Sequence, residues 1–293
     1  MKDGLDAEQA LPAAPACDQR VLHRLSLATG PTPEGADAVE GVGVVVDVET
    51  TGLDHDTDEV IELAARRFTY DADHIITRID KPHVWRQEPG IPLSELVIKK
   101  TGLTDDVLKG CSIDCAEAAR IIASADIRIA HNAKFDRPFV DSLLPQIAGL
   151  SWACSISDIG WSEFGFESAN LSWVLGQVGY FHDPHRAVAD VDATIQILRH
   201  EVQPGRTALS ILMERASQDG WTVRAFGSAF GTKDRLKARG YSWDPDRRVW
   251  WKEVRDREGE EAWLAEKVYR APFRSTATMA DFERTDWRSR YAR

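Results

Sequence analysis

The chain has 293 residues, of which 43% are hydrophobic. This length and composition predict one sizeable folded domain with a smaller second one, and they exclude a wholly disordered protein. There is no apolar run of about 18 residues, and the first residues lack the basic start and apolar core of a signal peptide. We therefore expect a soluble, cytoplasmic protein without a membrane partner.

The cysteines do not form a metal-binding pattern. Cys17, Cys111, Cys115 and Cys154 include no Cys-x-x-Cys pair, and no histidine lies near Cys111 and Cys115 to complete a zinc set. We expect free, mostly buried thiols, as in proteins of a reducing compartment.

Charge changes sign along the chain. The net charge is −11, but residues 1–205 carry 17 Lys+Arg against 33 Asp+Glu, whereas residues 206–293 carry 19 against 14. An acidic body that collects metal ions, joined to a basic end, is compatible with a phosphate-bearing substrate, although charge alone does not identify it.

The first half of the chain predicts an arm followed by a β-rich region. Residues 1–40 are rich in Ala, Pro, Gly and Asp and predict a loosely ordered arm, in which only residues 21–25 have a helical pattern. Strands are expected at 42–49, 60–70 and 74–85, joined by short Asp-containing turns as in an antiparallel meander.

From residue 92 the pattern is mostly helical. Helices are expected at 92–100 and 112–124, after the segment 131–136 up to about 147, and at 171–178 and 186–200. Strands are expected at 127–130 and 151–156. The order predicts an α/β fold with a mixed sheet flanked by helices. A boundary is expected at Gln203-Pro204-Gly205, which separates a domain of residues 41–203 from a module of residues 206–293.

Two carboxylates stand at the end of the first predicted strand. Val44-Val45-Val46 indicates a buried strand, and Asp47 and Glu49 have the spacing that places both side chains on one face. Two neighbouring acids repel unless a cation lies between them, and Mg²⁺ and Mn²⁺ favour oxygen ligands. On this pair alone, ordinary strand-end acids that face water remain an equal alternative.

Further acids and a histidine follow in suitable places. Asp136 comes just after a predicted central strand, and Asp190 lies in the first turns of a helix, five residues after His185. Alone, Asp136 reads as a helix N-cap and Asp190 as a solvated helix acid. Together with Asp47 and Glu49, they are carboxylates that a compact sheet could bring to one edge.

These residues carry a resemblance to a known family. The segments Asp47-Val48-Glu49-Thr50-Thr51-Gly52-Leu53, His131-Asn132-Ala133-Lys134-Phe135-Asp136 and His185-Arg186-Ala187-Val188-Ala189-Asp190 resemble the three motifs of the DEDDh, or DnaQ-like, exonucleases. That family includes the proofreading subunit of the bacterial replicative polymerase, RNase T and oligoribonuclease. The resemblance covers about residues 40–200 and implies an RNase H-like fold and 3′→5′ release of nucleoside monophosphates.

The resemblance also implies roles for the site residues. Asp47, Glu49, Asp136 and Asp190 would hold two divalent cations, Mg²⁺ or Mn²⁺, which can activate water and stabilise the entering and leaving oxygens. His185 would take the proton from the water, which suits an imidazole with an unperturbed pKa of about 6.5.

Roles are also expected for neighbouring residues. By resemblance, Leu53 and the backbone of Thr50 and Thr51 would bind the terminal nucleotide, with core packing as the alternative for Leu53. His131 and Asn132 are expected either to orient the site or substrate or to act structurally. Two residues are expected outside the site. Asp192 lies about 200° around the helix from Asp190 and is expected on the surface or behind a ligand, and His182 lies outside the motif, so its proximity to His185 is expected to be by chance.

The basic C-terminal module is rich in tryptophan. It holds Trp221, Trp243, Trp250, Trp251, Trp263 and Trp287, and residues 233–252 predict a basic helix, a glycine stop and a hairpin turning at 244–246. We expect a small α+β module. Aromatics interleaved with Arg and Lys suit single-strand binding, but a small domain also needs large side chains for its core, and we prefer that explanation for several of them.

The leading hypothesis is a metal-dependent 3′→5′ exonuclease acting on single-stranded DNA or RNA ends, with DNA favoured. One alternative is a polymerase-associated proofreading subunit, although no clamp-docking stretch follows His200. Others are an RNA-trimming exoribonuclease and a non-catalytic nucleic-acid-binding adaptor. The acids do not separate DNA from RNA, because the 2′-hydroxyl is read by the shape of the pocket.

Overall fold

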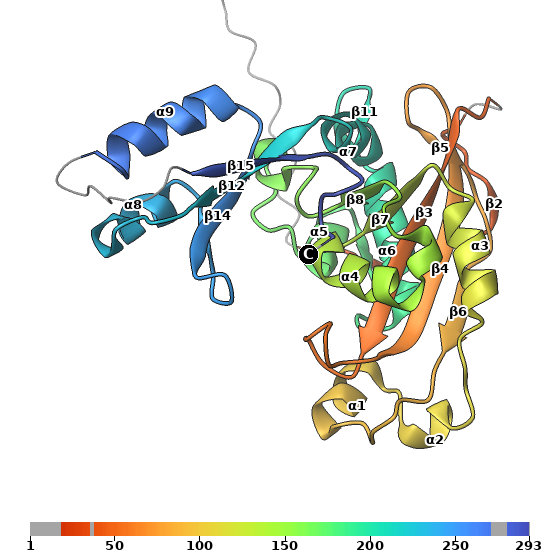
Figure 1. The fold of residues 1–293 in the computed structure, drawn as a ribbon. Helices are drawn as coiled ribbons and strands as arrows, with labels where there is room; N and C mark the ends of the chain where they lie inside the picture. Colours follow the sequence, from red (N-terminus) through yellow and green to blue (C-terminus); the bar gives the residue numbers. More distant parts are fainter. Residues whose placement is uncertain (1–18, 36–37, 271–279, 293) are drawn as a thin grey trace, which may run out of the picture.

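The computed structural model describes residues 19–35, 38–270 and 280–292. Its main body is a seven-stranded mixed sheet with helices packed against both faces (Figure 1). The strand order is β2-β5-β4-β3-β7-β8, and β6 also pairs with β4. The predicted α/β class with a mixed, helix-flanked sheet is confirmed.

The central strand is β3. It pairs antiparallel with β4 and parallel with β7, which in turn pairs parallel with β8. The strands of the sheet are β2 (Gly30–Pro31), β3 (Gly41–Thr50), β4 (Val60–Tyr70), β5 (Ile76–Ile79), β6 (His83–Arg86), β7 (Ile127–Ala130) and β8 (Trp152–Cys154). β3 has a paired strand on each side, so it is an interior strand of the sheet. Its carboxyl end therefore lies between neighbouring strands.

The strand expected at 74–85 is divided in two. β5 and β6 both pair with β4, and the chain between them contains Pro82. A proline has no backbone N–H for a sheet hydrogen bond, so one continuous strand through this position is disfavoured.

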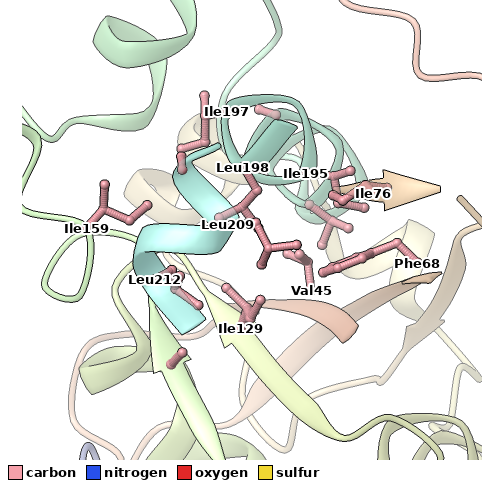
Figure 2. Close-up of a cluster of buried hydrophobic side chains, with 14 of the residues drawn as sticks. Val45, Phe68, Ile76, Ile129, Ile159, Ile195, Ile197, Leu198, Leu209 and Leu212 are labelled. Carbon is pink, nitrogen blue, oxygen red and sulfur yellow. The ribbon is translucent and has the colours of Figure 1, made fainter. Parts of the chain in front are cut away.

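Helices cover each face of the sheet with a separate core. Val45 packs with α5, α6 and α7 on one face, where Figure 2 shows it with Phe68, Ile195, Leu198 and Leu209. Val44, Val46 and Val48 pack with α3 and α4 on the other face. The helices of the body are α1 (Glu95–Thr101), α2 (Asp105–Leu108), α3 (Cys115–Ala123), α4 (Ala133–Leu143), α5 (Leu171–Gln177), α6 (Ala187–Arg199) and α7 (Ala208–Ala216). Short 3₁₀ turns stand at η1 (Pro145–Ile147) and η2 (Trp161–Phe164).

The described part of the N-terminal arm is paired and packed. β1 (His23–Arg24) pairs parallel with β9 (Tyr180–Phe181), and Leu25 and Leu27 pack against the main core. The helix expected at 21–25 is therefore wrong, because the side chains that pack inward alternate as in an extended chain. Residues 1–18 of the expected arm lie outside the described residues.

The chain after residue 203 does not separate from the body at once. β10 (Glu201–Gln203) and β11 (Arg206–Thr207) form a hairpin, and α7 then packs into the main core through Leu209 and Leu212. The expected boundary at 203–206 thus falls before a helix that belongs to the core of the body.

A smaller α+β unit follows α7, as expected for the C-terminal module. Its sheet has the order β13-β14-β12-β15, with strands β12 (Gly220–Ala225), β13 (Ser242–Asp244), β14 (Val249–Val254) and β15 (Asp281–Thr285). Helices α8 (Lys233–Ala238) and α9 (Arg257–Lys267) and the 3₁₀ turn η3 (Phe230–Thr232) complete it. The basic helix and the hairpin were predicted; Trp221, Trp250 and Trp263 pack at the edge of its core.

The last described residues bind this unit to the body. The Arg137 guanidinium on α4 donates to the carbonyls of Arg288 and Arg290, and the Trp152 amide donates to the Trp287 carbonyl over 2.7 Å. Arg290 in turn donates to Glu253 of β14 over 2.7 Å. Because Arg137 is only 1% exposed, this junction is part of the interior.

Two further expectations concern the cysteines and membrane-spanning helices. Among the described residues, Cys111, Cys115 and Cys154 are free thiols, and only Cys154 is fully buried. In the same residues, no helix combines the length and apolar character needed to cross a bilayer.

Candidate active site

The site begins at the carboxyl end of β3. Asp47 and Glu49 continue the face of the strand that Val45 presents to α6, because alternate residues share a face. The helix α6 carries Asp190 in its first turn. The packing that buries Val45 therefore also brings these acids towards Asp190.

Asp136 reaches the same place from α4. Its side chain is 2% exposed, and its Oδ1 accepts a hydrogen bond from the backbone N–H of Val48 over 3.2 Å. This bond joins the first turn of α4 to β3, between the two acids of the strand. Asp136 is thus joined to β3 and is not the N-cap of α4, which is Asn132.

Asp190 is fixed by two donors at the start of α6. Its Oδ2 accepts the backbone N–H of His185 over 2.9 Å, and its Oδ1 lies 2.7 Å from His182 Nε2. His185 is exposed and has a φ of 62°, in the left-handed region that non-glycine residues rarely adopt. One ligand atom each from Glu49, His185 and Asp190 lies within 4.8 Å of the others.

A further acid, Glu62, was not found from the sequence. Glu62 on β4 lies directly opposite Glu49 in the antiparallel register and is buried. Arg86 Nε donates to its Oε2 over 2.7 Å. An acid inside the apolar run Val60-Ile61-Glu62-Leu63 was the available signal, since a buried acid requires a partner.

The carboxyl groups perturb one another. Burial raises the pKa of Asp47 well above its usual value, and the charges of Asp136 and Asp190 raise it further. Burial, with the charges of Asp190 and Glu62, raises the pKa of Glu49 to about 7. Burial raises the pKa of Asp136 to about 8, although its hydrogen bond from Val48 favours the charged form. The cluster therefore favours a positive charge among its oxygens.

The residues fit a hard divalent cation. Ligand atoms of Glu49, His185 and Asp190 lie within 4.8 Å of one another, Asp136 bonds to the backbone of β3 at Val48, and oxygen ligands are those that Mg²⁺ and Mn²⁺ prefer. A cation among them would reverse the mutual repulsion that raises these pKa values. That Asp47, Glu49, Asp136 and Asp190 are the metal ligands stays a prediction.

The residues expected at the substrate have different surroundings. Thr50 is buried, and its hydroxyl donates to the Gly52 carbonyl, while Thr51 Oγ1 donates to Asp58 Oδ1 over 2.9 Å. These bonds shape the turn after β3. Leu53, in that turn, is 79% exposed, so core packing does not explain it.

His131 and Asn132 stand between β7 and α4. Burial lowers the pKa of His131 to about 4, and its Nδ1 lies 2.8 Å from the hydroxyl of Ser155. The His131 side chain is therefore neutral, and its contact with the buried Ser155 holds it in place. Asn132 is exposed and has a φ of 91°, which lets the chain turn from the strand into the helix.

The two residues expected outside the site behave differently. Asp192 accepts from the buried Arg66 over 2.6 Å, on the part of α6 that faces β4, as the helical rotation predicted. His182 contacts Asp190 directly, so its expected chance proximity is wrong. The chain between His182 and Asp190 turns back at His185. The sequence did not indicate this turn.

Two cations were also missed. Lys100 at the end of α1 and Arg186 before α6 are the positive charges that oppose the rise in the pKa of Glu49. Arg186 lies against Gly102, where an added Cβ would come within 2.1 Å of its Nη2. The left-handed Gly102 turn thus leaves room for this guanidinium.

The chain is similar to known proteins in sequence and in fold. The family model described as "Exonuclease" (RNase_T) matches residues 44–198. DNA polymerase III PolC-type of Staphylococcus haemolyticus is 31% identical over 186 residues, and that of Staphylococcus aureus is 30% identical; each match covers 58% of this chain. The aligned region is only 12% of each polymerase.

A solved structure supports the same assignment of fold. The zinc-bound complex of E. coli ExoI with single-stranded DNA aligns with a TM-score of 0.50 and 16% identity, over 74% of this chain and 63% of that one. At that identity the similarity concerns the fold, which is the RNase H-like mixed sheet. With the family match over more than half of its length, the chain belongs to the DnaQ-like DEDD family of 3′→5′ exonucleases.

Proposed function

We propose that the protein is a metal-dependent 3′→5′ exonuclease that removes nucleoside monophosphates from single-stranded 3′ ends. The observation that carries this proposal is that Glu49 of β3, His185 and Asp190 of α6 offer ligand atoms within 4.8 Å of one another, while Asp136 of α4 accepts the backbone N–H of Val48 on β3. The raised pKa values of Glu49 and Asp136 add to it, because perturbed acids in one cluster are typical of functional sites.

The residues divide the work of phosphodiester hydrolysis. Asp47, Glu49, Asp136 and Asp190 would hold the divalent cations. Two such ions, Mg²⁺ or Mn²⁺, would supply activation of a water and stabilisation of the charge on the leaving oxygen. His185 takes the proton from the attacking water, and its exposed position at the mouth of the cluster gives it access to solvent.

Residues around the cluster bind the end of the strand. Leu53 is exposed beside the acids and offers an apolar contact to the terminal nucleotide. Thr50 and Thr51 shape the turn that presents it, and Asn132, exposed between β7 and α4, offers an amide. Lys100 and Arg186 supply positive charge for the phosphates beside Glu49.

DNA is the favoured substrate. The relatives are DNA polymerases by name, and the solved structure of similar fold was crystallised with single-stranded DNA. Matched DNA and RNA strands of one sequence, degraded side by side, test this preference. Faster loss of the RNA strand would reassign the protein as an exoribonuclease.

Similarity to PolC-type polymerases also favours a second candidate, an exonuclease that acts with a polymerase. Purification from the native source, followed by identification of bound proteins, tests it. A polymerase recovered in stoichiometric amount would support proofreading, and recovery of the protein alone would support a separate enzyme.

The activity itself is tested with a 5′-labelled single strand. In Mg²⁺ or Mn²⁺, a ladder should shorten from the 3′ end, and EDTA should stop it. A strand that remains intact under these conditions would contradict the proposal.

A further inference from the structure

Large aromatic side chains are exposed on the smaller α+β unit. Phe230 is 81% exposed, Trp243 is 47% exposed and Phe226 is 37% exposed. Exposed rings gathered on one unit mark a binding site more often than isolated ones do. The core of the unit does not need them, since Val223, Leu236 and Leu264 fill it.

The strand register places Trp243 in the same row of the sheet as Ala225, which Phe226 follows. Trp243 of β13 lies opposite Trp250 of β14, which lies opposite Ala225 of β12. Phe226 follows Ala225 directly, and the short loop that it begins leads to Phe230. We call Phe226, Phe230, Trp243 and the neighbouring Lys233 the aromatic surface.

Cations accompany the rings of the aromatic surface. Lys233 Nζ lies 4.4 Å from the centroid of the Phe230 ring, and the exposed fraction of that ring leaves it open to a second partner. Lys237, Arg247 and Arg248 are exposed on the adjoining helix and hairpin turn. Rings that can stack on bases, with cations that can meet phosphates, are the combination used to bind single strands.

The charge of the chain makes this location suitable for a polyanion. Residues 1–205 carry the excess of acids, whereas residues 206–293 carry 19 Lys+Arg against 14 Asp+Glu. A strand held only at the metal cluster would otherwise lie against an acidic body. Cationic side chains that neutralise phosphates also release counterions, which strengthens binding at low salt.

The hairpin that carries Trp243 is held against α4 of the body through the opposite face of β14. The Trp251 ring of β14 lies 5.0 Å from Nζ of Lys134, which is two residues before Asp136. Trp251 pairs with Ser242, the neighbour of Trp243. In Figure 1 the β13–β14 hairpin and the carboxyl end of β3 point towards the same side of the molecule.

We propose that the aromatic surface binds the part of a single-stranded nucleic acid that lies 5′ of the end held at Asp47 and Asp190. Bases stack on Phe230 and Trp243, and Lys233 meets the phosphate between them. The proposal rests on the exonuclease function, because that function supplies the strand. It predicts tighter binding of long strands than of short ones.

The test uses the full chain and two lengths of oligodeoxyadenylate. One length is about 4 nucleotides and the other about 30, which brackets the ~4–16 nucleotides that single-strand modules cover. Binding is measured in an Asp47→Asn background, and hydrolysis is measured without that change. The variants are Phe230→Ala with Trp243→Ala, and Phe230→Tyr with Trp243→Phe as the control that keeps both rings.

The alanine pair should weaken binding of the long strand about tenfold or more, on the scale of base–aromatic stacking, while the aromatic pair binds as wild type does. Hydrolysis of the short strand should be unchanged in both. If wild type degrades both strands and the alanine pair binds the long strand with unaltered affinity, the aromatic surface is not the binding site. Loss of short-strand hydrolysis with the alanine pair would also overturn the proposal. Absence of hydrolysis in wild type would instead contradict the exonuclease function.

Discussion

His182 Nε2 lies 2.7 Å from Oδ1 of Asp190, while the backbone N–H of His185 donates to Oδ2 of the same carboxylate. The His182 side chain is only 3% exposed, so the pair is part of the interior. Each oxygen of Asp190 thus has one fixed donor and a remaining lone pair for a cation. His182 thus orients the Asp190 carboxylate and is not itself a metal ligand.

Substitution of His182 should therefore weaken metal binding. Partners that orient a ligand typically contribute about 10–100-fold in metal affinity or activity. We expect His182→Ala to raise the Mn²⁺ concentration needed for half-maximal rate by about tenfold or more on that scale. Calorimetric titration of Mn²⁺ without substrate measures the same loss independently of activity. His23→Ala, on the exposed β1, is the control, and an unchanged Mn²⁺ affinity in His182→Ala would assign no such role.

Stability of the metal-free protein should fall as pH rises. The folded pKa values of Glu49 and Asp136, about 7 and about 8, exceed their ordinary values of 4.5 and 3.8. The folded state then binds more protons than the unfolded state between these limits, so each unit of pH in that window favours unfolding. In EDTA, the melting temperature should drop between about pH 5 and about pH 8.

Mg²⁺ should counteract this loss, because a cation favours the ionised acids. The rise in melting temperature on adding Mg²⁺ should be larger at about pH 8 than at about pH 5. Asp136→Asn removes one titrating group and should flatten the pH dependence measured in EDTA. An equal Mg²⁺ effect at both pH values would contradict this account of the cluster.

Arg137 should be essential to stability because it joins the two units. Its guanidinium, 1% exposed, donates to Arg288, Arg290 and Asp141. Arg137→Ala leaves the half-buried Asp141 without its buried cation, and breaking a buried ion pair typically costs about 3–5 kcal/mol. Urea unfolding measures the loss. Arg120→Ala, at an exposed site on α3, should change the free energy of unfolding by less than about 0.5 kcal/mol. Equal effects of the two substitutions would show that the junction does not stabilise the fold.

Leu53 should affect the substrate and not the fold. Its side chain is 79% exposed, so Leu53→Ala removes no core contact. If it covers the terminal nucleotide, the lost apolar contact should raise KM by about tenfold, on the scale of burying such a side chain. Leu96→Ala is the matched control, since Leu96 is 66% exposed on α1. A lowered melting temperature with normal kinetics in Leu53→Ala would show a structural role instead.

The sequence predicted most of the sheet and the acids because both depend on local patterns. Three valines before Asp47 indicated a buried strand, and the spacing to Glu49 indicated one face. The structure adds Val45, whose packing against α6 explains why that face meets Asp190. Periodicity also located α6 and β7 within about a residue.

Other features depend on contacts between distant segments. Glu62 joins the cluster through its register opposite Glu49, and His182 joins it through the reversed chain at His185. The segment 21–25 has a helical pattern but pairs with β9, where His23 lies opposite Tyr180. These two residues are more than 150 positions apart in the chain. α7 follows a turn that reads as a boundary, yet its apolar face fills the main core. Local propensity contains none of these pairings.

The most direct test of the central claim compares acids inside and outside the cluster. A 5′-labelled single strand in Mn²⁺ is incubated with wild type, Asp47→Asn, Asp190→Asn and Asp56→Asn, of which Asp56 is exposed in the turn after β3. The two-metal account predicts a 3′-shortened ladder for wild type and Asp56→Asn, and an intact strand for Asp47→Asn and Asp190→Asn. Hydrolysis by Asp47→Asn and Asp190→Asn at the wild-type rate would contradict it.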